Sequence, residues 1–442
     1  MHGAKAEAAA LENRVMFKTN TTRTRLLLFL PGVLAGCVSI PPAGGGEAPP
    51  AEFRRRFLLF CDLAVTEFHK EITPFPVHDR EYADPATHHM PAFEDAHAVR
   101  ALAVAYDMTG ARKYLDACRR WADHTLRCQS RMIPAGAYYM NHSRAPGEDH
   151  GQWNVADSGT IAMGVLATAV RCTDPAEKAR YLDSTKAFAK LVMDNYVSRE
   201  GGVSNGLWPE YAGPWWCSSA TFGTFAFQLY DETHDEKYLK VAMGALEWLL
   251  GQDFREVKPI TFEQRPSGIV FYCFDFYIHG LKHLSKGTPP YDRATRQIDL
   301  AIEWMAKNQK TRGAPIPDYT EKNVDLAGMP YLMYSFARLL PRHRDLVPIA
   351  DRELHYIGNL LCGVQRRGVE CGVQSLRDCA RPGEDMRPQG GRTPQECRPN
   401  VSRLMIWEVM TWGMLSYAER LAPGALCRSS HDRVSDPFGS RD

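Results

Sequence analysis

The sequence predicts an all-α protein, an (α/α)6 toroid in which six inner and six outer helices alternate along the chain. From residue 51 onward, apolar residues recur every three or four positions in segments of about 15–20 residues, while the period-two pattern of strands is absent. One kind of segment is amphipathic and charged, and the other is apolar on nearly every side. The two kinds alternate, as outer and inner helices of a double ring do.

The charged segments are expected to form the outer helices, because a helix with one polar face lies at the surface. They span residues 51–71, 111–128, 175–197, 236–254, 291–309 and 345–361. The segments that are apolar on nearly every side, called here the smooth segments, are rich in small and aromatic residues and are expected to form the inner helices. They span residues 91–109, 153–171, 218–233, 267–284, 325–340 and 401–421.

A repeated turn supports this arrangement, because fixed self-similarity is typical of repeat architectures. Short polar turns that end in Tyr-Leu follow three of the smooth segments, at residues 106–115, 172–182 and 230–239. The connections at the other end are long, and they span residues 129–152, 198–217, 254–266, 310–324 and 362–400. Functional loops lie on rigid scaffolds, so the site is expected among the long loops.

The N-terminus has the order of an export signal, with basic residues before an apolar run at residues 26–35. That run is too short to span a membrane as a mature helix. It ends in Leu-Ala-Gly-Cys37, which resembles a bacterial lipobox in which the cysteine is lipidated. Met16 stands where an ordinary signal begins, so Met1 and Met16 are both candidate starts.

These features predict an exported lipoprotein anchored to the membrane through Cys37, on the periplasmic or cell-surface face. Residues after Pro423 lack a helical pattern and are predicted to be polar tail. The expected domains are a lipoprotein signal peptide at 1–37, a flexible tether at 38–50, the catalytic toroid at 51–423 and the tail at 424–442.

The composition excludes some partners and leaves others open. A net charge of +1 argues against a general nucleic-acid surface. Besides Cys37, eleven cysteines are available for disulfides in an exported chain. Four of these, Cys362, Cys371, Cys379 and Cys397, are spaced too widely for the Cys-x-x-Cys ligands of structural zinc. No metal and no cofactor is predicted.

Two acids occupy equivalent places near the starts of the first two predicted inner helices. Asp95 follows Glu94, and Asp157 lies just after Trp153. Acids at helix N-termini are also ordinary caps. The matching placement favours a catalytic pair, because two carboxyl groups with separated roles suit acid/base work on a sugar bond.

The loop before the second inner helix favours a different chemistry. Tyr139, Asn141, His142 and Arg144 are the residue types that a uronate lyase needs. Asn, His or Arg neutralises the C6 carboxylate, Tyr or His removes the C5 proton, and Tyr can protonate the leaving oxygen. A structural interpretation stays open, in which Asn141 and Arg144 pin the loop while the tyrosines pack.

A second loop is predicted to bind the sugar. Aromatic faces stack on the C–H surface of sugar rings, and loop residues lie at the surface. An arginine near the next inner helix would explain a uronate preference through a bidentate carboxylate pair. The candidate substrate-binding residues, together with those of the first loop, are Trp153, Trp208, Glu210, Trp215, Trp216, Arg265 and Tyr272.

The alternating helices, the repeated turns and the two acids resemble the six-hairpin glycosidases. The layout over residues 51–421 is similar to that of unsaturated glucuronyl and rhamnogalacturonyl hydrolases. The resemblance implies that Asp95 and Asp157 support hydration of a C4–C5 double bond, in which one Asp donates a proton and activates water while the other orients the sugar. The family's Trp-x-Arg-Gly-Gln-x-Trp signature is absent, and Trp215-Trp216-Cys-Ser-Ser stands in its place.

The sequence therefore predicts a glycoside hydrolase that acts on oligosaccharides or polysaccharides containing uronic acid. The margin over a polysaccharide lyase is small. A non-catalytic glycan-binding lipoprotein is a third hypothesis, and a sugar isomerase is a fourth, because one fold hosts many reactions.

Overall fold

A computed structural model gives the fold of residues 50–68, 92–139, 153–206, 213–252, 268–312, 321–362 and 403–432. All of them belong to a compact unit that spans Glu47–Asp442. Twelve α-helices lie in these ranges, in the alternating order that the sequence predicts. The largest difference at a helix end is four residues, where the tenth helix begins at Glu321 rather than at residue 325.

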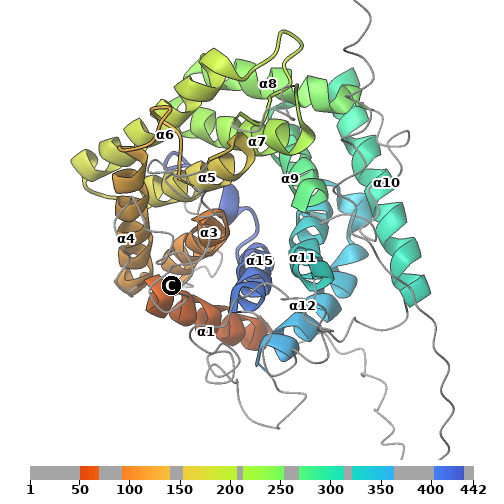
Figure 1. The fold of residues 1–442 in the computed structure, drawn as a ribbon. Coiled ribbons are helices and arrows are strands. Elements are labelled where there is room, and N and C mark those ends of the chain that lie inside the picture. The colour runs from red at the N-terminus through yellow and green to blue at the C-terminus, as the bar shows by residue number, and fades with distance from the viewer. Residues whose placement is uncertain are drawn as a thin grey trace, which may run out of the picture. The chain divides into compact units, whose positions relative to one another are not determined.

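Six helices form a closed inner ring, in which each packs against the next and the last packs against the first (Figure 1). In chain order they are α3 (Ala92–Thr109), α5 (Val155–Arg171), α7 (Trp216–Thr233), α9 (Gly268–His283), α11 (Glu321–Leu339) and α15 (Arg403–Leu421). The other six lie outside this ring. They are α1 (Pro50–Phe68), α4 (Arg112–Gln129), α6 (Pro175–Asn195), α8 (Glu236–Gly251), α10 (Pro289–Arg312) and α12 (Leu346–Cys362). The predicted (α/α)6 toroid is confirmed.

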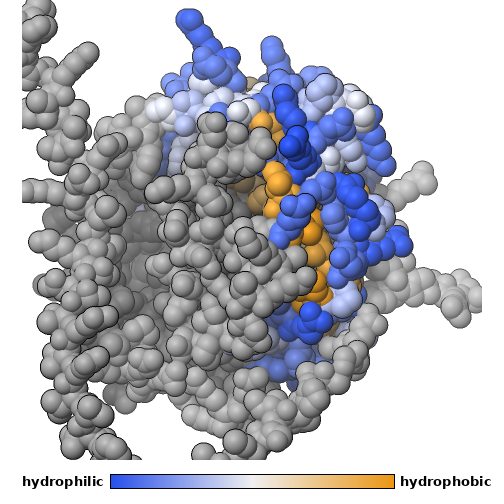
Figure 2. Space-filling view, turned by 90° about the vertical axis from the view of Figure 1, so that its right-hand side faces the viewer, coloured by the Kyte–Doolittle hydropathy of each residue, from blue (hydrophilic) through white to orange (hydrophobic). Residues whose placement is uncertain are grey.

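Small residues let the inner helices approach one another closely. A Cβ atom on Gly223 of α7 would lie 2.2 Å from the ring of Phe276 on α9. The outer helices keep polar faces, and hydrophilic side chains cover most of the described surface on the side of α10, with a narrow apolar strip between them (Figure 2). The contrast between smooth and charged segments thus corresponds to burial in the ring and exposure outside it.

The repeated turns hold the outer helices in place. Tyr114 of α4 donates to Asp62 of α1 over 3.0 Å, and Tyr181 of α6 donates to Asp123 of α4 over 2.8 Å. Each buried tyrosine therefore ties its outer helix to the preceding one. Asp174 caps α6 by accepting from two backbone N–H groups.

The predicted tail begins later than residue 424, because residues 424–432 pack onto the short-turn end of the ring. The Ser430 backbone N–H and hydroxyl donate to Glu232 at the end of α7, at 2.8 and 2.7 Å. Lys178 of α6 pairs with the same carboxylate. The local sequence pattern did not indicate that this segment is ordered, because the charged groups that it contacts lie far away in the sequence.

This contact makes the stability of the chain pH-dependent. Burial alone would raise the pKa of Glu232, but the hydrogen bonds from Lys178 and Ser430 outweigh burial and lower that pKa below its usual value. A carboxyl whose pKa is depressed on folding stabilises the fold above its unfolded-state pKa, and this contribution disappears as the pH falls through the folded value. We expect Glu232→Gln to lower the melting temperature at neutral pH and to flatten its decline below about pH 4.5. Scanning calorimetry across pH checks this, and parallel curves for both proteins would contradict it.

None of the cysteines that the structure describes forms a disulfide. Six of them are buried and the seventh, Cys427, is half-buried, and in such surroundings a cysteine behaves as a small apolar residue. They are Cys61, Cys118, Cys128, Cys172, Cys217, Cys273 and Cys427. The thiols of Cys362, Cys371, Cys379 and Cys397, like Cys37, lie outside the described side chains.

Candidate functional site

The inner helices run parallel, because each is followed by an outer helix that returns the chain to the same end. Their N-termini therefore meet at one end of the ring, called here the mouth. The long connections lie at this end, and the short turns lie at the other. Helix N-termini carry unpaired N–H groups and a positive partial charge, so acids and anions are favoured there.

Two acids lie in the first turn of α3, Glu94 and Asp95, and both are buried. Glu94 Oε2 accepts from the Trp412 indole N–H at 3.1 Å and from the Thr411 hydroxyl at 3.4 Å. Both donors belong to α15, so Glu94 is fixed at the seam between the first and last inner helices. Asp95 is 1% exposed.

The third acid, Asp157, lies in the first turn of α5, the helix that packs beside α3. Its side chain is half-buried, while its neighbours from residue 153 to 160 are buried. The Asn154 side chain caps α5 by accepting from the Asp157 N–H, and its amide donates to Asp157 Oδ2, both at 2.9 Å. The two predicted acids thus lie at equivalent places on adjacent inner helices.

Below the acids lies a buried aromatic floor. His97 of α3 is hydrogen-bonded through Nε2 to the Tyr272 hydroxyl of α9 at 3.0 Å. The Trp412 ring lies 4.9 Å from the His97 ring and 4.3 Å from that of Phe271, centre to centre. These contacts join α3, α9 and α15 beneath the mouth.

Burial controls the protonation of this floor. Burial, followed by the charge of Glu94, raises the pKa of Tyr272 well above its usual value, and Asp157 adds to the effect. Burial, followed by the charge of Arg100, lowers the pKa of His97. At neutral pH Tyr272 is therefore a neutral phenol, hydrogen-bonded to a neutral imidazole. The pair is a fixed hydrogen bond rather than a base ready to take a proton.

Some predicted substrate-binding residues are buried instead. Trp153 is 1% exposed, because its ring packs against Tyr196 and over Gly206. Tyr139 is also buried, and Tyr272 is held by His97 in the floor. The structure thus places these three side chains in the interior, and their predicted contacts with substrate stay predictions.

Trp215 and Trp216 remain the described candidates for sugar stacking. Trp215 precedes α7 and Trp216 begins it, and both are half-buried at the mouth. The other predicted binding residues lie outside the described ranges, and they are Asn141, His142, Arg144, Trp208, Glu210 and Arg265.

Sequence reasoning missed three residues that build the mouth and the buried layer beneath it, which are Glu94, His97 and Trp412. Glu94 had a visible signal, since two adjacent acids open an inner helix. Trp412 had none, because its bond to Glu94 joins positions 318 residues apart.

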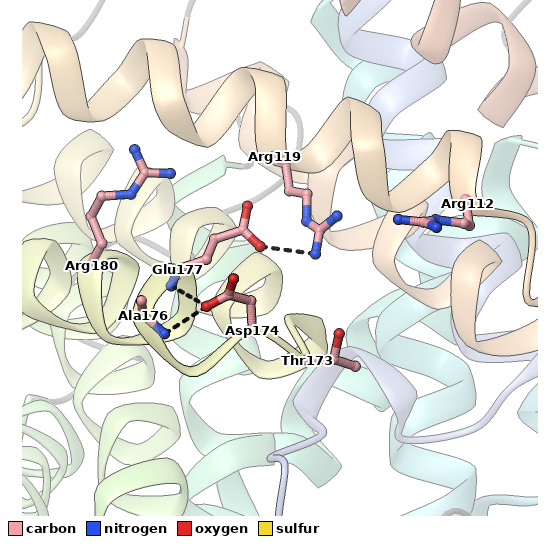
Figure 3. A pocket seen from close by; sticks show the side chains of 7 residues that line it. All are labelled: Arg112, Arg119, Thr173, Asp174, Ala176, Glu177 and Arg180. Carbon is pink, nitrogen blue, oxygen red and sulfur yellow. Dashed lines mark hydrogen bonds and ion pairs between the residues drawn. The ribbon is translucent and has the colours of Figure 1, made fainter.

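A groove of about 610 Å³ lies at the opposite end of the ring, between α4 and α6 (Figure 3). Three arginines line it, but Arg119 pairs with Glu177 at 2.9 Å and Arg180 with Asp123 at 2.6 Å. Asp174 is occupied as the cap of α6. The groove is therefore an outer surface crossed by ion pairs, at the end remote from the mouth acids.

Within the described ranges, no group of three or more His, Cys, Asp or Glu side chains is placed to hold a metal ion. Among the same residues, no helix has both the length and the apolar character that a membrane span requires.

No protein-family model matches the chain, and no curated protein matches it. Solved structures do. Dfg5 from Chaetomium thermophilum, crystallised in complex with glucosamine, is 11% identical, with 85% of this chain and 92% of that chain covered and a TM-score of 0.50. A glycoside hydrolase family 76 mannosidase, Bt3792 from Bacteroides thetaiotaomicron VPI-5482, is 12% identical over 84% of this chain and 99% of its own, with a TM-score of 0.46. At this identity, the likeness to Dfg5 shows a shared fold.

Proposed function

We propose that the chain is a carbohydrate-active enzyme that hydrolyses a glycosidic linkage at the mouth of the ring. The observation that carries this proposal is the placement of Asp95, Asp157 and the Trp215–Trp216 pair on three successive inner helices, α3, α5 and α7. Two carboxyl groups in different environments can divide acid and base roles. Half-exposed indole rings beside them offer a face on which a sugar can stack.

A toroid of this fold holds an amino sugar in the Dfg5 crystal structure, which supports a sugar ligand here. For the finer activity we propose hydrolysis of an unsaturated uronic acid. Asp157 protonates C4 of the double bond and then takes a proton from the water that attacks C5. The resulting hemiketal opens and releases the neighbouring sugar, while Asp95 orients the ring. Cys37 would anchor this activity outside the cytoplasm.

The test is a product assay on intact uronic-acid polymers, on their unsaturated oligosaccharides and on saturated glycans. Ultraviolet absorbance follows the C4–C5 double bond, and a reducing-sugar assay follows released ends. Loss of absorbance from the unsaturated oligosaccharides supports the whole proposal. Release of ends from saturated glycans alone supports hydrolysis and overturns the uronate preference. Gain of absorbance from intact polymer overturns hydrolysis in favour of a lyase, and binding without any product overturns the enzyme.

A further inference from the structure

Helices α3 and α9 face each other across the axis of the inner ring. In the closed order of the six inner helices, α9 is the third helix from α3 in either direction. The hydrogen bond between His97 and Tyr272 nevertheless joins them directly, over 3.0 Å. This hydrogen bond, called here the first rung, spans the axis of the ring just below the mouth.

The alignment of His97 with Tyr272 predicts a second pair of facing residues further along the same two helices. Because the two helices run parallel, an advance of three residues moves both chains by the same rise of about 4.5 Å. Three residues after His97 comes Arg100, and three residues after Tyr272 comes Asp275. An arginine and an aspartate therefore lie at the same depth on opposite sides of the axis.

Both of these side chains are buried with unused hydrogen-bonding groups. Arg100 is 2% exposed, and none of its three guanidinium nitrogens has an acceptor in the described part of the chain. Asp275 is 1% exposed; its Oδ1 accepts from the Tyr331 hydroxyl at 2.5 Å, but its Oδ2 has no donor there. A guanidinium keeps its charge, and a buried charge without a partner is costly.

The Arg100 charge acts electrostatically on His279 of α9, on the opposite side of the axis. Burial lowers the pKa of His279 on α9 to about 4, and Arg100 contributes to that shift while Asp275 opposes it. Two further orphan atoms come from neighbouring positions in the ring, His97 Nδ1 on α3 and Thr224 Oγ1 on α7. Buried donors and acceptors without a partner in the described part of the chain therefore lie on three inner helices, α3, α7 and α9.

We propose that Arg100 and Asp275 form a water-mediated ion pair across the axis, as a second rung beneath His97–Tyr272. Buried waters typically make about three hydrogen bonds to polar groups that otherwise lack partners. Here the donors are the Arg100 N–H groups and the acceptor is Asp275 Oδ2, with Thr224 and His97 completing the shell. The rung does not depend on the proposed reaction, and it holds two opposite inner helices at a fixed separation below the mouth.

A high-resolution crystal structure of the unmodified chain tests the water directly. Ordered solvent within hydrogen-bonding distance of both Arg100 and Asp275 Oδ2 is expected. Direct contact between the two side chains would overturn the proposal. An anomalous bromide peak at Arg100 after a bromide soak would also overturn it, in favour of a bound anion.

A double-mutant cycle tests the coupling. Arg100→Met and Asp275→Asn are each expected to lower the melting temperature by roughly 5–10 °C, because each leaves the other group unmatched. The double variant is expected to lose clearly less than the sum, whereas additive losses would overturn the pair. Arg112→Met, at the exposed start of α4, is the matched control and should not change the melting temperature. If Arg100→Met does not fold, Arg100→Gln, which also removes the charge, replaces it in the cycle.

Discussion

Asp157→Asn is expected to lower kcat by roughly 10²–10⁴-fold, the range that general acid–base groups contribute. The substitution removes the acidic proton that a carboxyl group can donate, while the side chain keeps nearly the same shape. Its stability should change little, because Asn154 can still donate to the new side-chain oxygen and the backbone cap is unchanged. Loss of the carboxylate at the start of α5 costs only about 0.3–1 kcal/mol. The product assay and thermal unfolding of the same preparation check both statements.

Asp183→Asn is the matched control, since Asp183 is an exposed acid on the outer helix α6. It should keep full activity. Retained activity in Asp157→Asn would contradict the acid's chemical role. A loss of activity that follows a large drop in melting temperature would show that Asp157 serves the fold as a cap instead.

Asp107→Ala is expected to reduce the free energy of unfolding by about 3–5 kcal/mol. Asp107, near the end of α3, accepts from Arg171 at 2.7 Å and from Arg428 at 2.6 Å. The Arg171 side chain is 2% exposed, so removal of the carboxylate leaves a buried guanidinium without its counter-charge. The same change releases Arg428, which helps to hold residues 424–432 on the ring.

Urea unfolding, followed by circular dichroism, measures this loss. Asp116→Ala is the comparison, because Asp116 is exposed on α4 and pairs with Arg119 at 3.5 Å. Exposed pairs contribute about 0–1 kcal/mol, so this variant should remain close to the unmodified protein. Equal losses in the two variants would contradict the argument from burial.

Local pattern was sufficient to predict the ring. Inner and outer helices differ along their whole length in the number of polar positions, so both their order and most of their ends could be read. The repeated turns indicated where each outer helix begins, and the tyrosines of α4 and α6 in these turns hydrogen-bond to the preceding outer helices. These signals lie within short stretches of chain.

The site depended on contacts that no local pattern carries. The starts of α3 and α5 gave the positions of Asp95 and Asp157, but the bond between Glu94 and Trp412 needs the ring to close. Trp153 was predicted at the start of the second inner helix as a substrate-binding residue, but its ring is buried, with Gly206 of the connection after α6 packed closely over it. The sequence also does not show that His97 aligns with Tyr272, or Arg100 with Asp275. These alignments exist only because α3 and α9 face each other in the folded ring.

The location of the site is tested most directly by a crystal structure of Asp157→Asn soaked with an unsaturated uronate disaccharide. The account predicts sugar density at the mouth, with its ring against Trp215 or Trp216 and its double bond within reach of residue 157. Sugar density in the groove between α4 and α6, or an empty mouth at saturating ligand, would contradict it.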